Sequence, residues 1–118
     1  MTSPSEVRRR LAADLSETLD RLSGLERERA GILEAAESAN SDDEHDPEGA
    51  TIAFEREHTA ALLRDARQHL DEIYAALRRL DEGSYGVCAT CGQPIAADRL
   101  TARPTATTCI TCASRRRP

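Results

Sequence analysis

The chain has 118 residues, of which 31% are charged and 39% are hydrophobic, and its formal net charge is -5 at pH 7. This length fits one ordinary domain, or a smaller domain with an extension, and excludes a large enzyme core. A negative net charge opposes the counterion-releasing attraction through which proteins bind free nucleic acid, so we expect no direct sequence-specific DNA binding. Aromatic residues make up only 3% of the chain, so small apolar side chains must do most of the packing.

No stretch of the sequence approaches the ~20 consecutive apolar residues of a membrane-spanning helix, and the N-terminus lacks the apolar stretch of a signal peptide. We therefore expect a cytoplasmic protein that does not bind membranes. In a reducing compartment, paired Cys-x-x-Cys units are more often metal ligands than disulfides.

A long helix is predicted to begin at the N-terminus, where Ser3 can cap it, Pro4 suits its first position and Glu6 completes a capping box. Downstream, the side chains of one face recur at alternating spacings of four and three, the period of a coiled-coil seam. The positions of this first seam are Leu11, Leu15, Thr18, Leu22, Leu25, Arg29, Ile32 and Ala36.

A turn is predicted over residues 41–45, after which Asp46 can cap a second helix and Pro47 lies in its first turn. Gly83 is the predicted C-terminal cap of this helix. Its seam has the same alternating spacing and consists of Ile52, Arg56, Thr59, Leu63, Ala66, Leu70, Ile73, Leu77 and Leu80.

The two seams match if the chain reverses near residue 43, because Leu25 then faces Leu62 and Leu63, Leu15 faces Ile73, and Val7 faces Leu80. Helices of ~30 residues would each be ~45 Å long. The predicted fold is mainly α: residues 1–82 form a long antiparallel coiled-coil hairpin with a tip near residues 40–51. Residues 83–118 follow as a small four-cysteine finger and a basic C-terminal tail.

The tip of the hairpin is predicted to be acidic and loosely packed. Arg29 and Arg56 occupy seam positions that approach each other near the tip, where like charges oppose tight packing. Between them the sequence contains no Lys or Arg but eight carboxylates, which are Glu34, Glu37, Asp42, Asp43, Glu44, Asp46, Glu48 and Glu55. A solvated turn would also account for such a run of acidic residues.

Four cysteines follow the second helix as Cys88-x-x-Cys91 and Cys109-x-x-Cys112, with seventeen residues between the pairs. Two intervening residues let a tight turn present both sulfurs to one tetrahedral ion, and the long gap lets a second turn close the coordination sphere. Four protein ligands leave no open position for water, so the predicted Zn²⁺ is structural. Two disulfides, four independent thiols, or a site that releases zinc on oxidation are the alternatives.

No motif in the sequence indicates catalysis. There is no glycine-rich phosphate loop, and no Ser/His/Asp or Cys/His arrangement is suggested by a local motif. His45, His58 and His69 lack the spacing of a metal or catalytic site. We therefore expect a protein that is not an enzyme.

The segment around the cysteines closely resembles the zinc finger of the DksA/TraR family. The resemblance is carried by Tyr85-Gly86-x-Cys88-x-x-Cys91-Gly92-x-x-Ile95-x-x-x-Arg99-Leu100-x-Ala102-Arg103-Pro104-x-Ala106-x-x-Cys109-x-x-Cys112. It implies a transcription regulator that binds RNA polymerase rather than DNA and inserts its coiled coil through the secondary channel toward the catalytic centre. A redox-responsive zinc-binding adaptor, acting through its helices on another protein, is the alternative function.

The tip departs from the family pattern Asp-x-x-Asp-x-Ala. The corresponding residues here are Asp46, Glu48, Gly49 and Thr51, and among them only Asp46 matches, because Gly49 replaces the second Asp and Thr51 replaces the Ala. The resemblance therefore implies that these residues face the polymerase active site, without implying that they inhibit initiation as the family tip does.

Arg99 and Arg103 match basic residues that the family places at a site for the alarmone ppGpp, formed together with polymerase. Glu72 and Ala113, however, stand where the family has cations. Charge-assisted contacts contribute ~1.5 to 3 kcal/mol each, so we expect ppGpp binding to be weak or absent. Alternatively, the two arginines orient the finger against the hairpin.

Overall fold

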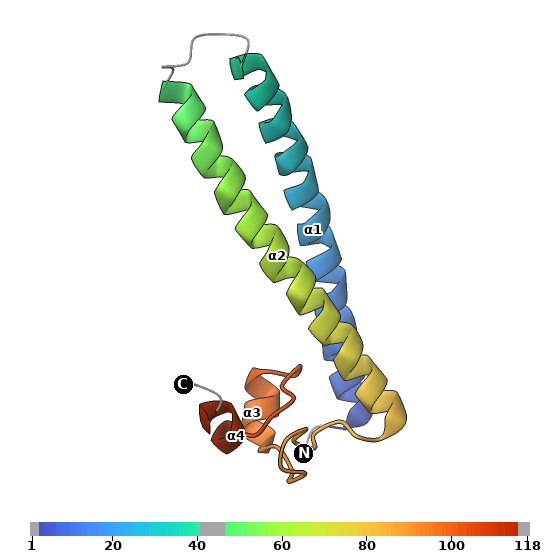
Figure 1. Cartoon of the computed structure of the whole chain (residues 1–118). Helices are drawn as coiled ribbons and strands as arrows, with labels where there is room; N and C mark the ends of the chain where they lie inside the picture. Colours follow the sequence, from blue (N-terminus) through green and yellow to red (C-terminus); the bar gives the residue numbers. More distant parts are fainter. Residues whose placement is uncertain (1–2, 41–46, 116–118) are drawn as a thin grey trace. The chain divides into compact units, whose positions relative to one another are not determined.

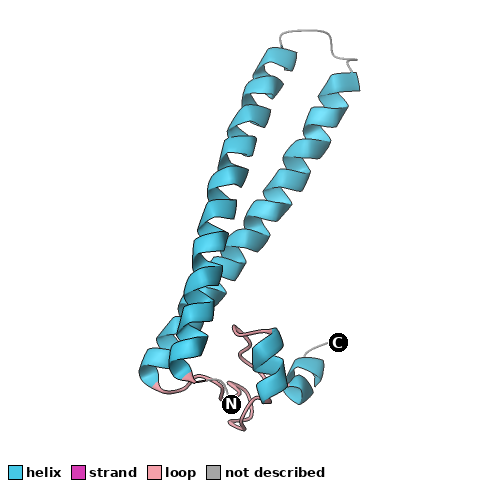
Figure 2. Cartoon of the chain, turned by 180° about the vertical axis from the view of Figure 1, so that it is seen from behind, coloured by secondary structure: helices cyan, strands magenta, loops and turns pink. Residues whose placement is uncertain are grey.

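A computed structural model describes residues 3–40 and 47–115 of the chain, with side chains described for 3–38 and 49–115. Its helices, in chain order, are α1 (Pro4–Asn40), α2 (Pro47–Glu82), α3 (Ala97–Ala102) and α4 (Ile110–Arg115) (Figure 1). The described residues contain no β-strand (Figure 2). Val87 and Pro94 form an isolated antiparallel bridge. The prediction of a mainly α fold with two long helices is confirmed.

Of the three predicted caps of the long helices, the two that lie in the described residues are present, and Asp46 lies outside them. At the start of α1, the Glu6 backbone N–H donates to the Ser3 hydroxyl at 3.3 Å. At the end of α2, Gly83 has a φ of 80°, and the Ser84 N–H donates to the Arg79 carbonyl at 2.9 Å. The last turn of α2 thus ends in a Schellman motif, which needs a left-handed residue that glycine adopts at little cost.

The chain divides into two compact units. The finger unit consists of residues 1–16 and 71–118, and the hairpin unit consists of residues 17–70. Both long helices contribute to each unit. No helix of the described residues is both long enough and apolar enough to cross a membrane.

In the finger unit, α1 and α2 pack through a cluster that contains Val7, Leu11, Ile73 and Ala76. Leu11, Ile73 and Ala76 are fully buried, and Leu15, Leu77 and Leu80 pack against the cluster. Leu15 and Ile73, which were expected to face each other, both belong to this cluster, and so do Val7 and Leu80. Exposed Arg8 pairs with Asp81 at 2.8 Å across the same two helices.

In the hairpin unit, the two long helices pack in the predicted register. Leu25 of α1 packs with Leu63 and Ala66 of α2, whereas Leu62, also expected to face Leu25, is exposed and lies outside this cluster. Between Leu25 and Thr59, no residue with a described side chain is buried. The absence of buried side chains among those described in this part of the hairpin agrees with the looser packing expected toward the tip.

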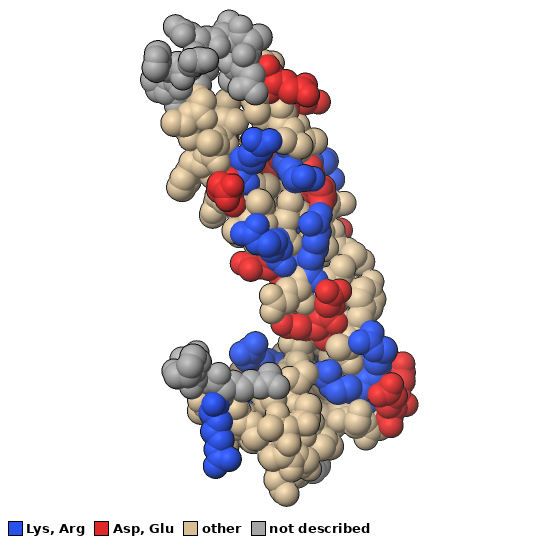
Figure 3. Space-filling view, viewed as in Figure 1, with Lys and Arg blue, Asp and Glu red and all other residues tan. Residues whose placement is uncertain are grey.

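The surface of the hairpin unit carries charges of both signs. Glu26 of α1 forms an ion pair with Arg67 of α2 and lies 3.9 Å from Arg29. Arg29 and Arg56 are both exposed. On the face shown in Figure 3, basic and acidic side chains are interspersed along the long helices. The two seam arginines therefore point their charges to water rather than into the interface between the helices.

Candidate metal centre and neighbouring surfaces

The four cysteines converge at one point of the finger unit. All four are free thiols, and their sulfur atoms lie within 4.8 Å of one another. The Sγ atoms of Cys91 and Cys109 are 3.8 Å apart. A tetrahedron with Zn–S bonds of ~2.3 Å has edges of ~3.8 Å, so this separation fits two ligands of one zinc ion.

The first Cys-x-x-Cys pair is presented by a tight turn. The Cys88 N–H donates to the Gln93 carbonyl at 2.8 Å, and the Gly92 N–H donates to the Cys88 carbonyl at 3.0 Å. Gly92 has a φ of 75°, a left-handed conformation that closes the turn and that other residues adopt at a cost. The turn over residues 88–93 therefore brings the sulfurs of Cys88 and Cys91 to the same cluster.

The second pair lies where α4 begins, with Cys109 just before the helix and Cys112 in its first turn. The Cys112 N–H donates to the Cys109 sulfur at 3.5 Å. The two pairs are joined by a backbone hydrogen bond of 2.8 Å from the Ala89 N–H to the Thr107 carbonyl. Cys88 and Cys112 are buried with Ile95, so the metal centre is also the core of the finger.

Local hydrogen bonds shift the pKa values of the thiols in opposite directions. Backbone N–H groups of Cys91 and Cys109 lower the pKa of Cys88 to about 6. The pKa of Cys109 is also lowered, chiefly by the Cys112 N–H. The pKa of Cys112 is raised to about 12, first by its hydrogen bond to Cys109 and then by burial. Without a cation the sulfurs share protons, and a bound dication replaces those protons because coordinating thiols are deprotonated.

Three further side chains hold the finger in place through backbone carbonyls. The Tyr85 hydroxyl donates to the Pro104 carbonyl at 2.7 Å, and the Arg79 guanidinium lies 3.5 Å from the Thr105 carbonyl. The Arg99 Nε donates to the Thr108 carbonyl at 2.8 Å. Arg79 carries no motif that would have singled it out in the sequence.

Arg99 and Arg103 lie with Glu72 and Ala113 around one hollow of about 240 Å³. Glu72 comes from α2, Arg99 from α3, and Ala113 from α4. The four positions compared with the family's ppGpp site are therefore neighbours. The hydrogen bond from Arg99 to the Thr108 carbonyl lies within the finger. The alternative role predicted for Arg99 is a contact that orients the finger against the hairpin.

The tip residues are only partly described. Asp46 lies outside the described residues, as does the turn predicted over 41–45, and Glu48 belongs to α2 without a described side chain. Gly49 and Thr51 lie in the first two turns of α2 and are exposed. The structure thus places two of the four predicted tip residues on the surface, at the start of the second helix.

Comparisons with known proteins agree with this architecture. Residues 83–118 match the family model "Prokaryotic dksA/traR C4-type zinc finger". Together with the four converging thiols, this match shows that Cys88, Cys91, Cys109 and Cys112 hold one structural zinc ion.

Similar proteins extend the match beyond the finger. YteA of Bacillus subtilis is 42% identical over 66 residues, which are 56% of this chain and 28% of YteA. The RNA polymerase-binding transcription factor DksA of Caulobacter vibrioides is 36% identical over 94 residues, which are 79% of this chain and 58% of that protein. The chain thus spans less than two thirds of the length of these curated relatives.

The structure of transcription factor DksA2 from Pseudomonas aeruginosa superimposes with a TM-score of 0.77 at 30% identity. The match covers 95% of this chain and 81% of DksA2, so it includes the long helices as well as the finger. The chain therefore belongs to the DksA/TraR family.

Proposed function

We propose that this protein is a transcription regulator that binds RNA polymerase in the secondary channel and places its acidic tip near the active site. The observation that carries the proposal is the match to DksA2 over 95% of this chain. The Caulobacter relative is named as an RNA polymerase-binding transcription factor. In this proposal residues 1–82 are the part that enters the channel, residues 83–118 are the finger, and the protein acts in the cytoplasm without catalysis of its own.

The proposed effector is the segment of residues 40–51, with Asp46, Glu48, Gly49 and Thr51 facing the active site. Carboxylates near a catalytic metal or near basic groups change the local potential, and this effect is strong where water is excluded. Within this segment the carboxylates are Asp42, Asp43, Glu44, Asp46 and Glu48. The tip therefore supplies negative charge although its second family Asp is absent.

We further propose that ppGpp acts weakly or not at all through this protein. Arg99 and Arg103 would contact the phosphates from the hollow that they share with Glu72 and Ala113. Support comes from the charges of that hollow, because two arginines face one carboxylate where the family has additional cations. The Arg99 Nε already donates to the Thr108 carbonyl, so this residue has only its terminal nitrogens to offer a phosphate.

The proposal is tested by fluorescence anisotropy of zinc-loaded protein, labelled at its N-terminal amine and titrated with core RNA polymerase from the same organism. A known secondary-channel factor serves as competitor. Saturable binding that the competitor displaces is expected. Binding that the competitor leaves unchanged would overturn the assignment to the channel, and absence of binding would overturn the assignment to polymerase and favour another protein partner.

A further inference from the structure

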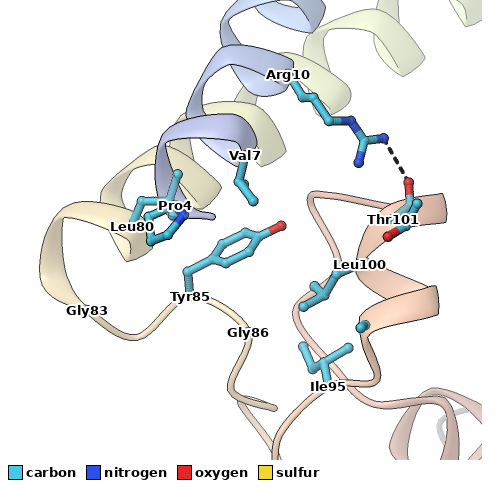
Figure 4. A pocket seen from close by; sticks show the side chains of 11 residues that line it. Pro4, Val7, Arg10, Leu80, Gly83, Tyr85, Gly86, Ile95, Leu100 and Thr101 are labelled. Carbon is cyan, nitrogen blue, oxygen red and sulfur yellow. Dashed lines mark hydrogen bonds between the residues drawn. The ribbon is translucent and has the colours of Figure 1, made fainter. Parts of the chain in front are cut away.

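A cavity of about 360 Å³ lies in the finger unit, between the ends of the long helices and the finger (Figure 4). On one side are Val7 and Leu80 of the helical cluster, and on the other are Ile95 and Leu100 of the finger core. The two hydrophobic clusters of the finger unit are thus separate, and the cavity lies where they would otherwise join. Its volume falls within the range of ~300 to 1,000 Å³ typical of small-molecule sites.

The walls of the cavity are mostly apolar, with polar groups gathered at one side. Arg10 is the only charged residue among the described residues that line it. Its Nη2 donates to the Thr101 carbonyl at 2.8 Å, which holds the guanidinium across the rim (Figure 4). A guanidinium has five N–H donors, so this contact leaves others for a ligand.

The remaining polar side chains offer less to a ligand. The hydroxyl proton of Tyr85 is already committed to the Pro104 carbonyl, although its oxygen lies near the positive charge of Arg10. No carboxylate lines the cavity among the described residues. The site therefore combines an apolar interior with one exposed cation that is hydrogen-bonded at its rim, and planar carboxylates match a guanidinium in geometry as well as charge.

We propose that this cavity binds a small carboxylate with an aliphatic tail, the carboxylate paired with Arg10 and the tail between Val7, Leu80 and Leu100. A dry cavity of ~150 Å³ is enough to hold benzene, so the larger volume here accommodates a chain of several methylene groups. A polyphosphate fits this cavity poorly because most of its charges would face apolar walls. The site is thus distinct in chemistry from the hollow around Arg99 and Arg103.

A bound ligand would connect the helical cluster to the finger core. Because such a ligand binds the folded protein and not the unfolded chain, it raises the stability of the finger unit by mass action. This proposal concerns the isolated protein and does not depend on binding to polymerase.

The test uses the full zinc-loaded chain, labelled with ¹⁵N and titrated with sodium octanoate below its micelle concentration. We expect saturable amide shifts that concentrate at Gly83, Gly86 and Thr101, which line the cavity. Octylammonium, which has the same tail and the opposite charge, is expected to bind at least about tenfold more weakly, because it meets Arg10 with a like charge.

Substitutions at Arg10 separate the ligand contact from the packing of the finger. Arg10→Gln is expected to raise the dissociation constant for octanoate about tenfold, and Arg10→Lys is expected to raise it less, because Lys keeps the charge and loses the planar fork. Arg9→Gln is the matched control, because Arg9 is an exposed neighbour on α1 that does not line the cavity. Zinc content and amide dispersion verify that each variant is folded.

Three outcomes would overturn the proposal. They are the absence of saturable shifts at the cavity, equal binding of octanoate and octylammonium, and equal affinities of the folded Arg10→Gln and Arg9→Gln variants. Since none of these measurements includes polymerase, failure here leaves the proposed transcriptional function untouched, and failure of polymerase binding leaves this site untouched.

Discussion

The Tyr85 hydroxyl donates a hydrogen bond to the Pro104 carbonyl at 2.7 Å, and this contact joins two segments of the finger that are 19 residues apart in the chain. Tyr85 follows the C-terminal cap of α2 and packs against the helical cluster of the finger unit. Pro104 lies between α3 and the second pair of cysteines. The contact therefore ties the loop that leads to the second pair of ligands to the end of the long helices.

Replacing Tyr85 with Phe is expected to lower the free energy of unfolding of the zinc-loaded protein by ~1 kcal/mol. The ring still packs, but the partly buried Pro104 carbonyl loses its donor. Urea denaturation followed by circular dichroism measures the change. Tyr74→Phe is the matched control, because Tyr74 is an exposed tyrosine of α2. Equal losses in both variants would show that the hydrogen bond does not stabilise the finger unit.

Replacing Ile73 with Ala is expected to cost ~2 to 5 kcal/mol, because Ile73 is fully buried in the cluster between α1 and α2. The removed methyl groups leave a cavity that a two-helix core cannot easily close. Leu62→Ala is the control, since Leu62 of α2 is 39% exposed and is expected to lose much less. Denaturation midpoints of the two variants give the comparison, and a cost near zero at Ile73 would contradict the observed register.

Much of the hairpin could be predicted from spacing because a helix has one period and one buried face. The positions of Leu11, Leu25 and Ile73 follow from that rule. Ala76, however, is fully buried although the predicted seam passes through Leu77. Leu77 is half-buried and still packs against the same cluster, so the buried face at this end of α2 is wider than one seam and includes the small neighbour Ala76.

The metal ligands were also predictable, because Cys-x-x-Cys spacing reflects the geometry of a single tight turn. The contacts of Arg10 and Arg79 could not be predicted from the sequence, because each joins a long helix to a carbonyl of the finger more than 25 residues away in the chain. No periodicity encodes such contacts. They depend on how the finger packs against the helix ends, which only the three-dimensional structure provides.

Zinc binding to the metal-free protein at pH 7.5 is expected to release protons. Cys88, with a pKa of about 6, is already a thiolate at this pH, whereas Cys112, with a pKa of about 12, is protonated. For each proton that zinc displaces, the apparent zinc affinity is expected to fall about tenfold when the pH is lowered by one unit. A pH indicator in weakly buffered solution measures the release on addition of zinc.

Chelation provides the converse measurement. Removing zinc is expected to unfold residues 84–114 while α1 and α2 retain much of their helicity, which proteolysis and circular dichroism report separately. If zinc addition releases no protons, or if chelation leaves the finger resistant to protease, a structural role for zinc would be contradicted.

Adding positive charge to the hollow around Arg99 and Arg103 is expected to strengthen the response to ppGpp. Glu72→Lys with Ala113→Lys replaces one carboxylate and one methyl group that line this hollow. Since each charge-assisted contact contributes ~1.5 to 3 kcal/mol, we expect at least about tenfold tighter binding of ppGpp to the complex of this variant with polymerase. Asp71→Lys is the control, because Asp71 is an exposed carboxylate of α2 that does not line the hollow. A full ppGpp response of the unmodified protein would contradict the prediction of weak binding.

Restoring the family pattern at the tip is expected to change the effect on transcription without changing affinity for polymerase. A Cβ atom at Gly49 would meet no atom of the described residues within 4 Å, which leaves room for Gly49→Asp there, and a carboxylate in the first turn of α2 is favoured by the helix dipole. Combined with Thr51→Ala, it is expected to shorten the lifetime of an unstable open complex, measured by filter binding after a competitor challenge. Gly31→Asp is the control, because a Cβ atom at Gly31 in α1 would also meet no atom within 4 Å and this residue lies outside the tip. If the restored tip binds polymerase but leaves the open-complex lifetime at the value of the unmodified protein, residues 46–51 do not act on the active site.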